Sequence, residues 1–176
     1  NPIVQDNIRK LERFGYEMIA PDRGMLANGD DGDGRMPEPE VLFEYILREL
    51  ACEKDLAGKK VLVTAGATME AIDPVRYITN HSSGKMGCAL AKAAMQRGAK
   101  VTLVAGHMEV LPPMFVDVVN VKSAADMFEA VTKLAPEQDI IVKAAAVADY
   151  TPVAVADNKI KKSDDDMKIE LKRTCL

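Results

Sequence analysis

Residues 60–87 carry the side chains of this chain that are best placed to handle a phosphate. An apolar run ends at Gly66, and a polar, glycine-containing segment opens the next expected helix; that segment contains Ser82, Ser83, Gly84, Lys85 and Met86. Glycine lets backbone N–H groups approach an anion closely, and the hydroxyls and the ammonium group add donors and positive charge. The pattern predicts an anion nest at nucleotide-binding positions. The alternative, that the glycines only permit a tight turn and close helix packing, stays open.

A polar insert separates the apolar run from the helix start, whereas an ordinary dinucleotide fold joins the two within a few residues. Asp73, Arg76 and Asn80 lie in this insert, three and four positions apart. One helical turn would place Arg76 and Asn80 on a shared face. Arg can bind a phosphate or carboxylate in bidentate fashion, and Asn can hold an acyl carbonyl or an oxyanion. The alternative is that Asp73 caps a short helix and Arg76 is a surface residue.

Two further groups of polar residues follow later strands or lie in a polar tail. Asp149 comes after an apolar strand that includes Ala145 and Ala146, at the end where open α/β sheets bind ligands. Lys159, Lys161 and Lys162 form a cationic group that could close over phosphates. A turn role for Asp149 and a simply solvated surface for the lysines remain alternatives.

Several classes of protein are disfavoured by what is absent from the expected positions. The second strand ends in Val104–His107 with no acidic residue before Glu109, so the ribose contact of a nicotinamide dehydrogenase is missing. The histidines and cysteines have no metal-ligand spacing, so no side-chain metal site is predicted and Mg²⁺ would arrive with a nucleotide. A formal charge of -4 disfavours general nucleic-acid binding. No apolar run is long enough to span a membrane.

The elements that must position these residues follow from hydrophobic periodicity. Strand patterns at KVLVTAG, KVTLVAG and DIIVKAAAVADY alternate with a helix capped by Ser82 or Ser83 and a helix that opens with a Ser-x-x-Asp box at Ser123. Short links between such elements imply parallel strands with right-handed crossovers. We predict an α/β fold with a Rossmann-like doubly wound parallel sheet, of which this chain holds a part. The inward face of the first helix is expected at Met86, Leu90, Ala93, Ala94 and the stem of Arg97, with Gly98 closing the helix.

The first third of the chain has a different pattern. Residues 3–14 and a stretch beginning at Pro37 have helical spacing, and the glycine- and aspartate-rich segment between them is expected to be a loop. Residues 51–59 are predicted to be a polar linker between two domains. Three widely spaced cysteines suggest a reducing, cytoplasmic setting. The chain starts at Asn1 without Met and stops at Leu176, so we expect a piece of a longer protein.

The motifs AGATMEAIDPVRYITNHSSGKMG, RGAKVTLVAG, AAAVADY and NKIKK closely resemble the synthetase domain of bacterial bifunctional phosphopantothenoylcysteine decarboxylase and phosphopantothenate–cysteine ligase proteins of coenzyme A biosynthesis. RGMLANGDDGDGRMPEP resembles the substrate clamp of the flavin-dependent decarboxylase domain of the same proteins. The resemblance divides the chain into the end of a decarboxylase domain (1–50), a linker (51–59) and the first part of a synthetase domain with its flap (60–176).

The resemblance implies a CTP-dependent ligation fused to a decarboxylase that makes phosphopantetheine. Phosphopantothenate attacks CTP to give an acyl-cytidylate, and cysteine then displaces CMP. Asn80 matches the family residue that handles the acyl-cytidylate, Arg76 its neighbour, Asp149 the nucleotide-binding acid and Lys159 the flap lysine. CTP with Mg²⁺ would serve the synthetase and FMN the decarboxylase. The partners implied are phosphopantothenate and cysteine, with a homodimer formed through the synthetase domain and a larger homo-oligomer of the full-length protein.

Two departures from the family pattern bear on activity. Asn28 occupies the position of the family's proton-donating Cys, and an amide cannot protonate the enethiolate intermediate, so decarboxylation should fail here. An engineered replacement is one hypothesis for Asn28. After Thr174 the chain ends in Cys175 and Leu176, where the family continues with further strands, so an exposed sheet edge is expected. A non-catalytic nucleotide-binding or assembly fragment is therefore the alternative to the ligase.

Overall fold

The computed structural model describes residues 1–162 and 166–174 and contains two compact units. The first unit is Asn1–Ile46 and the second is Leu47–Leu176, so the division falls within helix α2 (Pro39–Leu50). The domain boundaries predicted around residues 51–59 stay a prediction.

The first unit contains helix α1 (Pro2–Arg13) and a hairpin of strands β1 (Asp22–Met25) and β2 (Asp31–Arg35). The side chain of Asn1 accepts a hydrogen bond from the backbone N–H of Ile3 and caps α1. The loop predicted between the two helices is wrong in part, because β1 and β2 pair in antiparallel fashion across it. Its aspartates and glycines give no apolar alternation, so periodicity could not reveal these strands.

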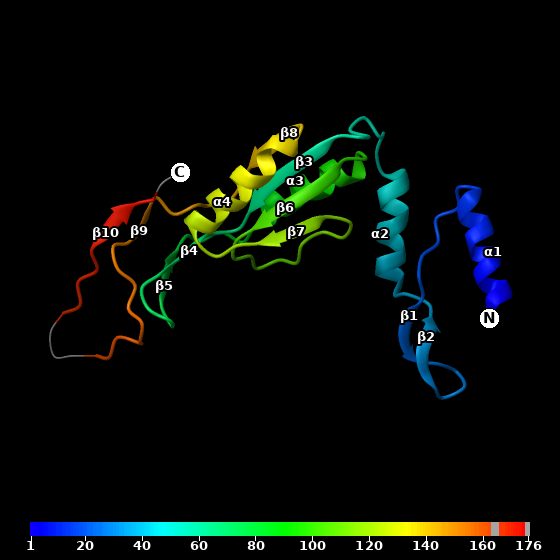
Figure 1. Ribbon diagram of the computed structural model, residues 1–176, viewed down its shortest axis with the longest axis horizontal. Helices are drawn as coiled ribbons and strands as arrows, with labels where there is room; N and C mark the ends of the chain where they lie inside the picture. Colours follow the sequence, from blue (N-terminus) through cyan, green and yellow to red (C-terminus); the bar gives the residue numbers. More distant parts are fainter. Residues whose placement is uncertain (163–165, 175–176) are drawn as a thin grey trace. The chain divides into compact units, whose positions relative to one another are not determined.

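The second unit is built on a four-stranded parallel sheet (Figure 1). The strands are β3 (Lys60–Ala65), β6 (Lys100–Ala105), β7 (Asp117–Asn120) and β8 (Ile140–Lys143), in the order β7-β6-β3-β8. Helices α3 (Lys85–Gln96) and α4 (Ala124–Leu134) connect them, and a short 3-10 helix, η1 (Ala135–Glu137), follows α4. The predicted Rossmann-like α/β fold is confirmed.

The central strand β3 is covered on both faces. Val61, Val63 and Ala65 pack in one cluster with α3, whereas Leu62 packs with Met127 of α4 on the opposite face. Full burial on both sides explains why this strand is an unbroken apolar run rather than an alternating one. Each such Val or Leu side chain contributes about 1.5–3 kcal/mol of burial free energy.

Two strand predictions need correction. The third predicted strand ends at Lys143, because the chain leaves the sheet before Ala144 and residues 144–149 form an irregular segment. Strand β7 is not predicted by the sequence pattern, because it has only two apolar residues, Val118 and Val119, between polar ends. The capping box of α4 is confirmed: Ser123 and Asp126 exchange hydrogen bonds between side chain and backbone.

The start and the inward face of α3 also differ from the prediction. The N-cap is Gly84, in the left-handed conformation, rather than Ser82 or Ser83. Of the predicted inward face, Met86 is 70% exposed and Leu90 is 38% exposed, whereas Ala94 does pack against the core. The buried residues of the helix are Gly87, Cys88, Ala91 and Met95. A Cβ built on Gly87 would lie 2.4 Å from the Cβ of Ala65, so this glycine sets how closely α3 approaches β3. The predicted closure at Gly98 is confirmed by its positive φ.

The insert between β3 and α3 is a β-hairpin, not a helical turn. Strands β4 (Met69–Ala71) and β5 (Tyr77–Thr79) pair in antiparallel fashion and leave residues 72–76 as the turn. A second pair, β9 (Tyr150–Pro152) and β10 (Leu171–Arg173), lies beyond the sheet. None of the helices described within residues 1–162 and 166–174 combines the length and apolarity needed to cross a membrane.

We predict that Gly87→Ala lowers the free energy of unfolding, by about 1–3 kcal/mol, because the added methyl group must displace β3 or α3. Urea denaturation followed by circular dichroism measures the change. Ala89→Ser, which also adds one heavy atom but at an exposed position of the same helix, is the control and should have little effect. A Gly87→Ala protein as stable as the parent would show that α3 and β3 can move apart without a loss in the free energy of unfolding.

Candidate functional site

The candidate site lies where β3 and β8 end, because the order of the chain reverses there. From β3 the chain moves through α3 to β6 and β7 on one side, then returns through α4 to β8 on the other side. In open α/β sheets, ligands bind at the carboxyl ends of the strands next to such a reversal. The segments that leave these strands here are residues 66–68 and 144–149.

Hydrogen bonds hold these exit segments together beyond the last strand residues. Ala67 donates to the carbonyl of His107, at 2.9 Å, and Thr68 donates to the carbonyl of Ala146, at 3.2 Å. The hydroxyl of Thr64 accepts hydrogen bonds from the N–H groups of Ala144 and Ala145, both at 3.2 Å. The predicted residues Ala145 and Ala146 therefore belong to a fixed floor at this edge, although their own side chains carry no polar group.

Asn80 reaches this floor from the end of the hairpin. Its Nδ2 lies 3.3 Å from the carbonyl oxygen of Ala146 and 3.4 Å from that of Val147, and donates to both. The residue is exposed. The structure thus joins two of the predicted groups, the insert and the segment after β8.

The two glycines predicted to approach an anion also pack against a neighbouring loop. Gly66 has φ +80°, and a Cβ there would lie 2.4 Å from the backbone oxygen of His107. A Cβ on Gly84 would lie 2.6 Å from the side chain of Met108. Close packing alone accounts for both glycines, which is the alternative left open above. At the helix start, Ser82 and Ser83 are half-buried, whereas Lys85 and Met86 are exposed.

Arg76 is not on a shared helical face with Asn80, as one helical turn would require. The turn residue Asp73 accepts hydrogen bonds from the N–H groups of Val75 and Arg76, and Arg76 donates from Nε (3.0 Å) and Nη2 (2.5 Å) to its Oδ2. The Asp73 side chain is fully buried, and that of Arg76 is 39% exposed. The alternative of a helix cap is also wrong, because Asp73 organises a hairpin turn.

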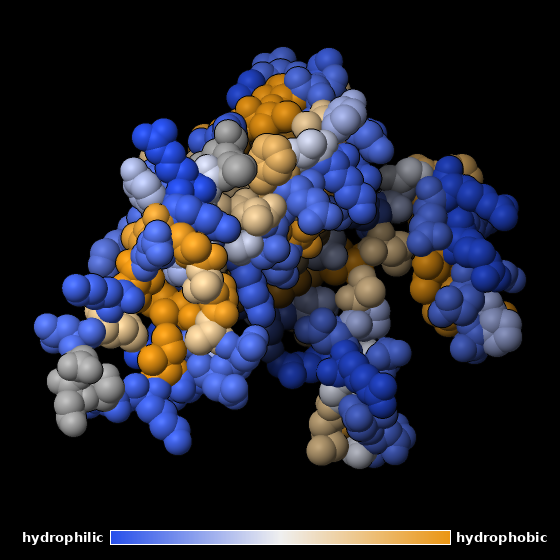
Figure 2. Space-filling model, turned by 60° about the vertical axis from the view of Figure 1, so that its left-hand side comes forward, coloured by the Kyte–Doolittle hydropathy of each residue, from blue (hydrophilic) through white to orange (hydrophobic). Residues whose placement is uncertain are grey.

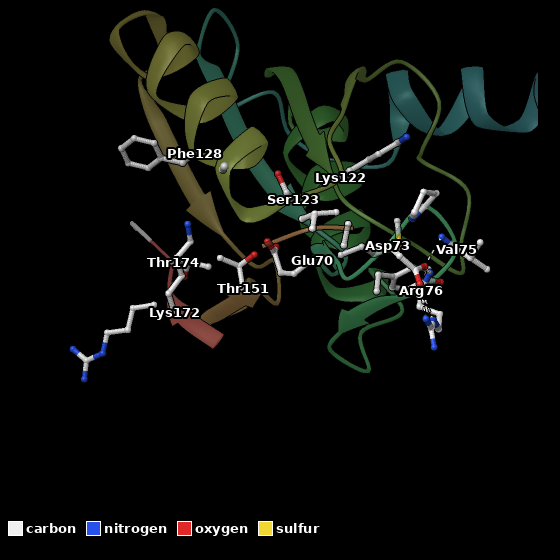
Figure 3. A pocket seen from close by; sticks show the side chains of 17 residues that line it. Glu70, Asp73, Val75, Arg76, Lys122, Ser123, Phe128, Thr151, Lys172 and Thr174 are labelled. Carbon is white, nitrogen blue, oxygen red and sulfur yellow. Dashed lines mark hydrogen bonds and ion pairs between the residues drawn. The ribbon is translucent and has the colours of Figure 1, made fainter. Parts of the chain in front are cut away.

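The charge of Asp73 is stabilised by these donors. The Arg76 guanidinium is the main reason that the pKa of Asp73 lies far below its usual range, and the backbone N–H groups of Val75, Ile160 and Arg76 lower it further against the opposing effect of burial. The ion pair is drawn with dashed lines in Figure 3.

A cavity of about 700 Å³ lies against the hairpin, and the predicted residues Asp73 and Arg76 are part of its lining (Figure 3). It is bounded by the hairpin, the start of α4 and the β9–β10 pair, and its polar lining includes Glu70, Lys122, Thr151 and Lys172. Sequence reasoning did not find these residues, because they are spread over four segments that no spacing rule connects. Glu70 is buried, and its carboxylate accepts a hydrogen bond from the N–H of Ala124 at the start of α4.

The remaining predicted residues are exposed. Asp149 lies next to the β9–β10 pair, where its carbonyl accepts a hydrogen bond from the N–H of Thr174. Lys159 directly precedes Ile160, whose backbone contacts the Asp73–Arg76 pair, and Lys162 follows two positions later. Among residues 1–162 and 166–174, no group of three or more His, Cys, Asp or Glu side chains could hold a metal ion.

Asn28 lies in the turn of the β1–β2 hairpin, in the first unit. Its side chain donates to Asp30, at 2.7 Å, and accepts from the N–H of Asp30, at 3.3 Å. The residue is exposed. Its role as the position of a proton donor stays a prediction. Of the cysteines, Cys52 and Cys88 are free, and Cys175 lies outside the described residues.

Comparison with known protein families gives a match over most of the second unit. Residues 56–175 match the family described as DNA/pantothenate metabolism flavoprotein C-terminal domain.

Individual relatives agree with the family match. The coenzyme A biosynthesis bifunctional protein CoaBC of Vibrio vulnificus strain YJ016 is 52% identical over 165 residues, which is 94% of this chain and 41% of that protein. The chain thus spans about two fifths of the length of this curated relative. The crystal structure of the C-terminal domain of a CoaBC protein has a TM-score of 0.59 at 48% identity and covers 68% of this chain and 56% of its own. A DNA/pantothenate metabolism flavoprotein from Streptococcus pneumoniae has a TM-score of 0.58 at 27% identity and covers 66% of this chain and 61% of its own.

These matches correct the function predicted from the sequence. The phosphopantothenate–cysteine ligase reaction is wrong as the assignment for this chain, because the family that matches residues 56–175 is described as part of a flavoprotein and no ligase domain is shown there. The non-catalytic alternative is not better supported. Bifunctional proteins of coenzyme A biosynthesis remain the relatives, as the resemblance indicated.

We predict that Asp73 stays ionised at pH 4, near the ordinary aspartate pKa of about 3.9. Because its pKa is lowered in the folded state, its contribution to stability is fully present above the pKa of the unfolded chain and is lost only as the pH falls through the lower folded value. Carbon-13 NMR of the side-chain carboxyl groups from pH 7 to pH 3 measures this. A midpoint for Asp73 near pH 4 would contradict the ion pair.

Proposed function

This chain belongs to the family of DNA/pantothenate metabolism flavoprotein C-terminal domains, and from that premise we propose that it is part of an enzyme of coenzyme A biosynthesis whose second unit binds a nucleotide. The observation that supports the proposal most directly is the convergence of Asn80 with the 144–149 segment where the strand order reverses. Phosphopantothenate and cysteine are the proposed substrates of the whole protein.

The nucleotide phosphates would lie at the start of α3. Backbone N–H groups at the first turn of a helix are free of helical partners and favour an anion, and Ser82, Ser83 and Lys85 add donors beside them. Asn80 would orient the ligand from the opposite side through its carboxamide oxygen, because its amide nitrogen is already used by the floor. Gly66 and Gly84 would keep Cβ atoms out of this region, while also packing against residues 107 and 108.

CTP is the nucleotide that the sequence resemblance implies, and Mg²⁺ would be held by its phosphates. FMN also carries a phosphate, as CTP does, but has an isoalloxazine ring in place of the cytosine base. The residues around the α3 start, which are Asn80, His81, Ser82, Ser83 and Lys85, fit a phosphate and offer no apolar slot for an isoalloxazine ring. We therefore derive no flavin chemistry from this edge.

The first unit is proposed to be the end of a flavin-dependent decarboxylase, with its substrate clamp in the β1–β2 hairpin. The hairpin places Asn28 at an exposed tip, which suits a segment that contacts a substrate bound elsewhere. FMN would belong to that decarboxylase. The cytoplasmic location expected from the cysteine spacing stays a prediction.

We predict that the second unit binds CTP and that Lys85→Ala weakens binding by about tenfold, which is the loss expected for one charge-assisted contact to a phosphate. Isothermal titration with CTP and Mg²⁺, with FMN and with phosphopantothenate separates the possible sources of the phosphate. Lys100→Ala is the matched control, since it removes a lysine at the amino end of β6. Binding of none of the three ligands, or equal CTP affinity in both variants, would overturn the proposal.

We further propose that two copies pair through the surface formed by the hairpin turn and β9. Its exposed apolar residues are Val75, Tyr77, Tyr150, Val153 and Val155. Figure 2 shows apolar side chains gathered among charged ones on the side of the molecule that bears β5, β9 and β10. An apolar patch that is exposed in a single copy usually marks a surface that becomes buried against a partner. The full-length protein would form a larger homo-oligomer.

We predict that the chain is a dimer and that Val155→Asp makes it a monomer, because a charge would have to be buried at the interface. Size-exclusion chromatography with light scattering measures the mass. Leu111→Asp, at an 89% exposed apolar residue after β6, is the control and should leave the mass unchanged. A monomeric parent chain would contradict the interface.

A further inference from the structure

The hairpin turn holds a segment that lies far away in sequence. The N–H of Ala156 donates to the carbonyl of Ile72, at 3.0 Å. The N–H of Ile160 donates to Oδ2 of Asp73, at 3.1 Å, and Nη2 of Arg76 donates to the carbonyl of Ile160, at 3.0 Å. Both polar backbone atoms of Ile160 are therefore satisfied by one ion pair.

This arrangement depends on the buried carboxylate. Oδ2 of Asp73 receives the Arg76 side chain and the Ile160 N–H, while Oδ1 receives the N–H groups of Val75 and Arg76. Hydrogen bonds to an ionised carboxylate are stronger than neutral ones, and exclusion of water strengthens them further. Removal of the charge would weaken the turn and the Ile160 contact together.

The residues on either side of Ile160 are cationic. Lys159, Lys161 and Lys162 are exposed and lie in an irregular segment that has no helix or strand of its own to order it. Such a segment is mobile unless something outside it fixes its backbone. The turn supplies that fixation at Ala156 and at Ile160.

We propose that Asp73 is a positioning residue: with Arg76 it clasps the backbone of Ile160 and so holds the lysines of residues 159–162 beside the hairpin. We call this arrangement the Asp73 clasp. Its consequence for catalysis rests on the proposed function, since only a phosphate-bearing ligand gives these lysines a role. The clasp itself does not depend on any ligand.

Two substitutions open the clasp from opposite sides. Asp73→Asn removes the charge but keeps a side chain of the same shape. Ile160→Pro removes the N–H that donates to Asp73 and leaves the hairpin unchanged. Asp139→Asn is the matched control, because Asp139 also accepts hydrogen bonds from a backbone N–H, that of Lys60, and from a lysine, Lys59, but at the other edge of the sheet.

The measurement is the rate of trypsin cleavage after Lys159, Lys161 and Lys162, mapped by mass spectrometry without nucleotide, with hydrogen exchange of residues 156–162 alongside. Because trypsin cleaves poorly before proline, the variants are compared at the sites after Lys161 and Lys162. We expect both variants to be cleaved about tenfold faster at these two sites, the ratio expected for loss of one charge-assisted hydrogen bond, and Asp139→Asn to match the parent. The double variant should be cleaved no faster than either single variant, because both act on the same contact.

Cleavage at the parent rate in variants that remain folded by circular dichroism would overturn the proposal. Ile160→Pro decides the matter if Asp73→Asn does not fold. An additive double variant would also overturn it, because the two residues would then act separately. Failure of CTP binding in a chain with a protected 159–162 segment would count against the proposed function alone, whereas fast cleavage with normal CTP binding in the parent would count against the clasp alone.

Discussion

The parallel pairing of β3 with β6 on one side and β8 on the other is the constraint on which the second unit depends. Val61, Leu62 and Val63 are almost wholly buried, so β3 cannot shift by one residue without exchanging the faces that α3 and α4 cover. Fixed register places Gly66, His107 and Ala146 at one edge. The hydrogen bonds of Ala67 and Thr68 then join the three exits into one floor.

Hydrogen bonds attach the hairpin to that floor at both ends. Thr79 donates its hydroxyl to the carbonyl of Thr68, and Asn80 donates to the carbonyls of Ala146 and Val147. At the same time, Glu70 binds the N–H of Ala124 at the first turn of α4. Side chains of the hairpin are therefore hydrogen-bonded both to the sheet edge and to the start of α4. A residue that orients a ligand, as proposed for Asn80, needs this kind of support from its neighbours.

Sequence reasoning succeeded where one local signal decided the structure. The apolar run of β3, the Ser123–Asp126 box of α4 and Gly98 after α3 each have a single local cause, and each was predicted correctly. It failed where tertiary contact overrode the local pattern. The face of α3 is set by the fit of Gly87 against Ala65, a contact between segments that sequence periodicity cannot relate.

The candidate site divides in the same way. Asn80 could be proposed from its place in the polar insert, and Asp149 from its place after an apolar strand, because strand ends gather at one edge of a parallel sheet. The partnership of Asp73 with Ile160 could not, since 87 positions separate the residues and the contact joins a carboxylate to a backbone N–H that any residue but proline provides. Because the partner of Asp73 is a backbone N–H, the type of residue at position 160 does not reveal the contact. For that reason the turn that looked like a helix cap in the sequence is, in the folded chain, the anchor of a segment far along the polypeptide.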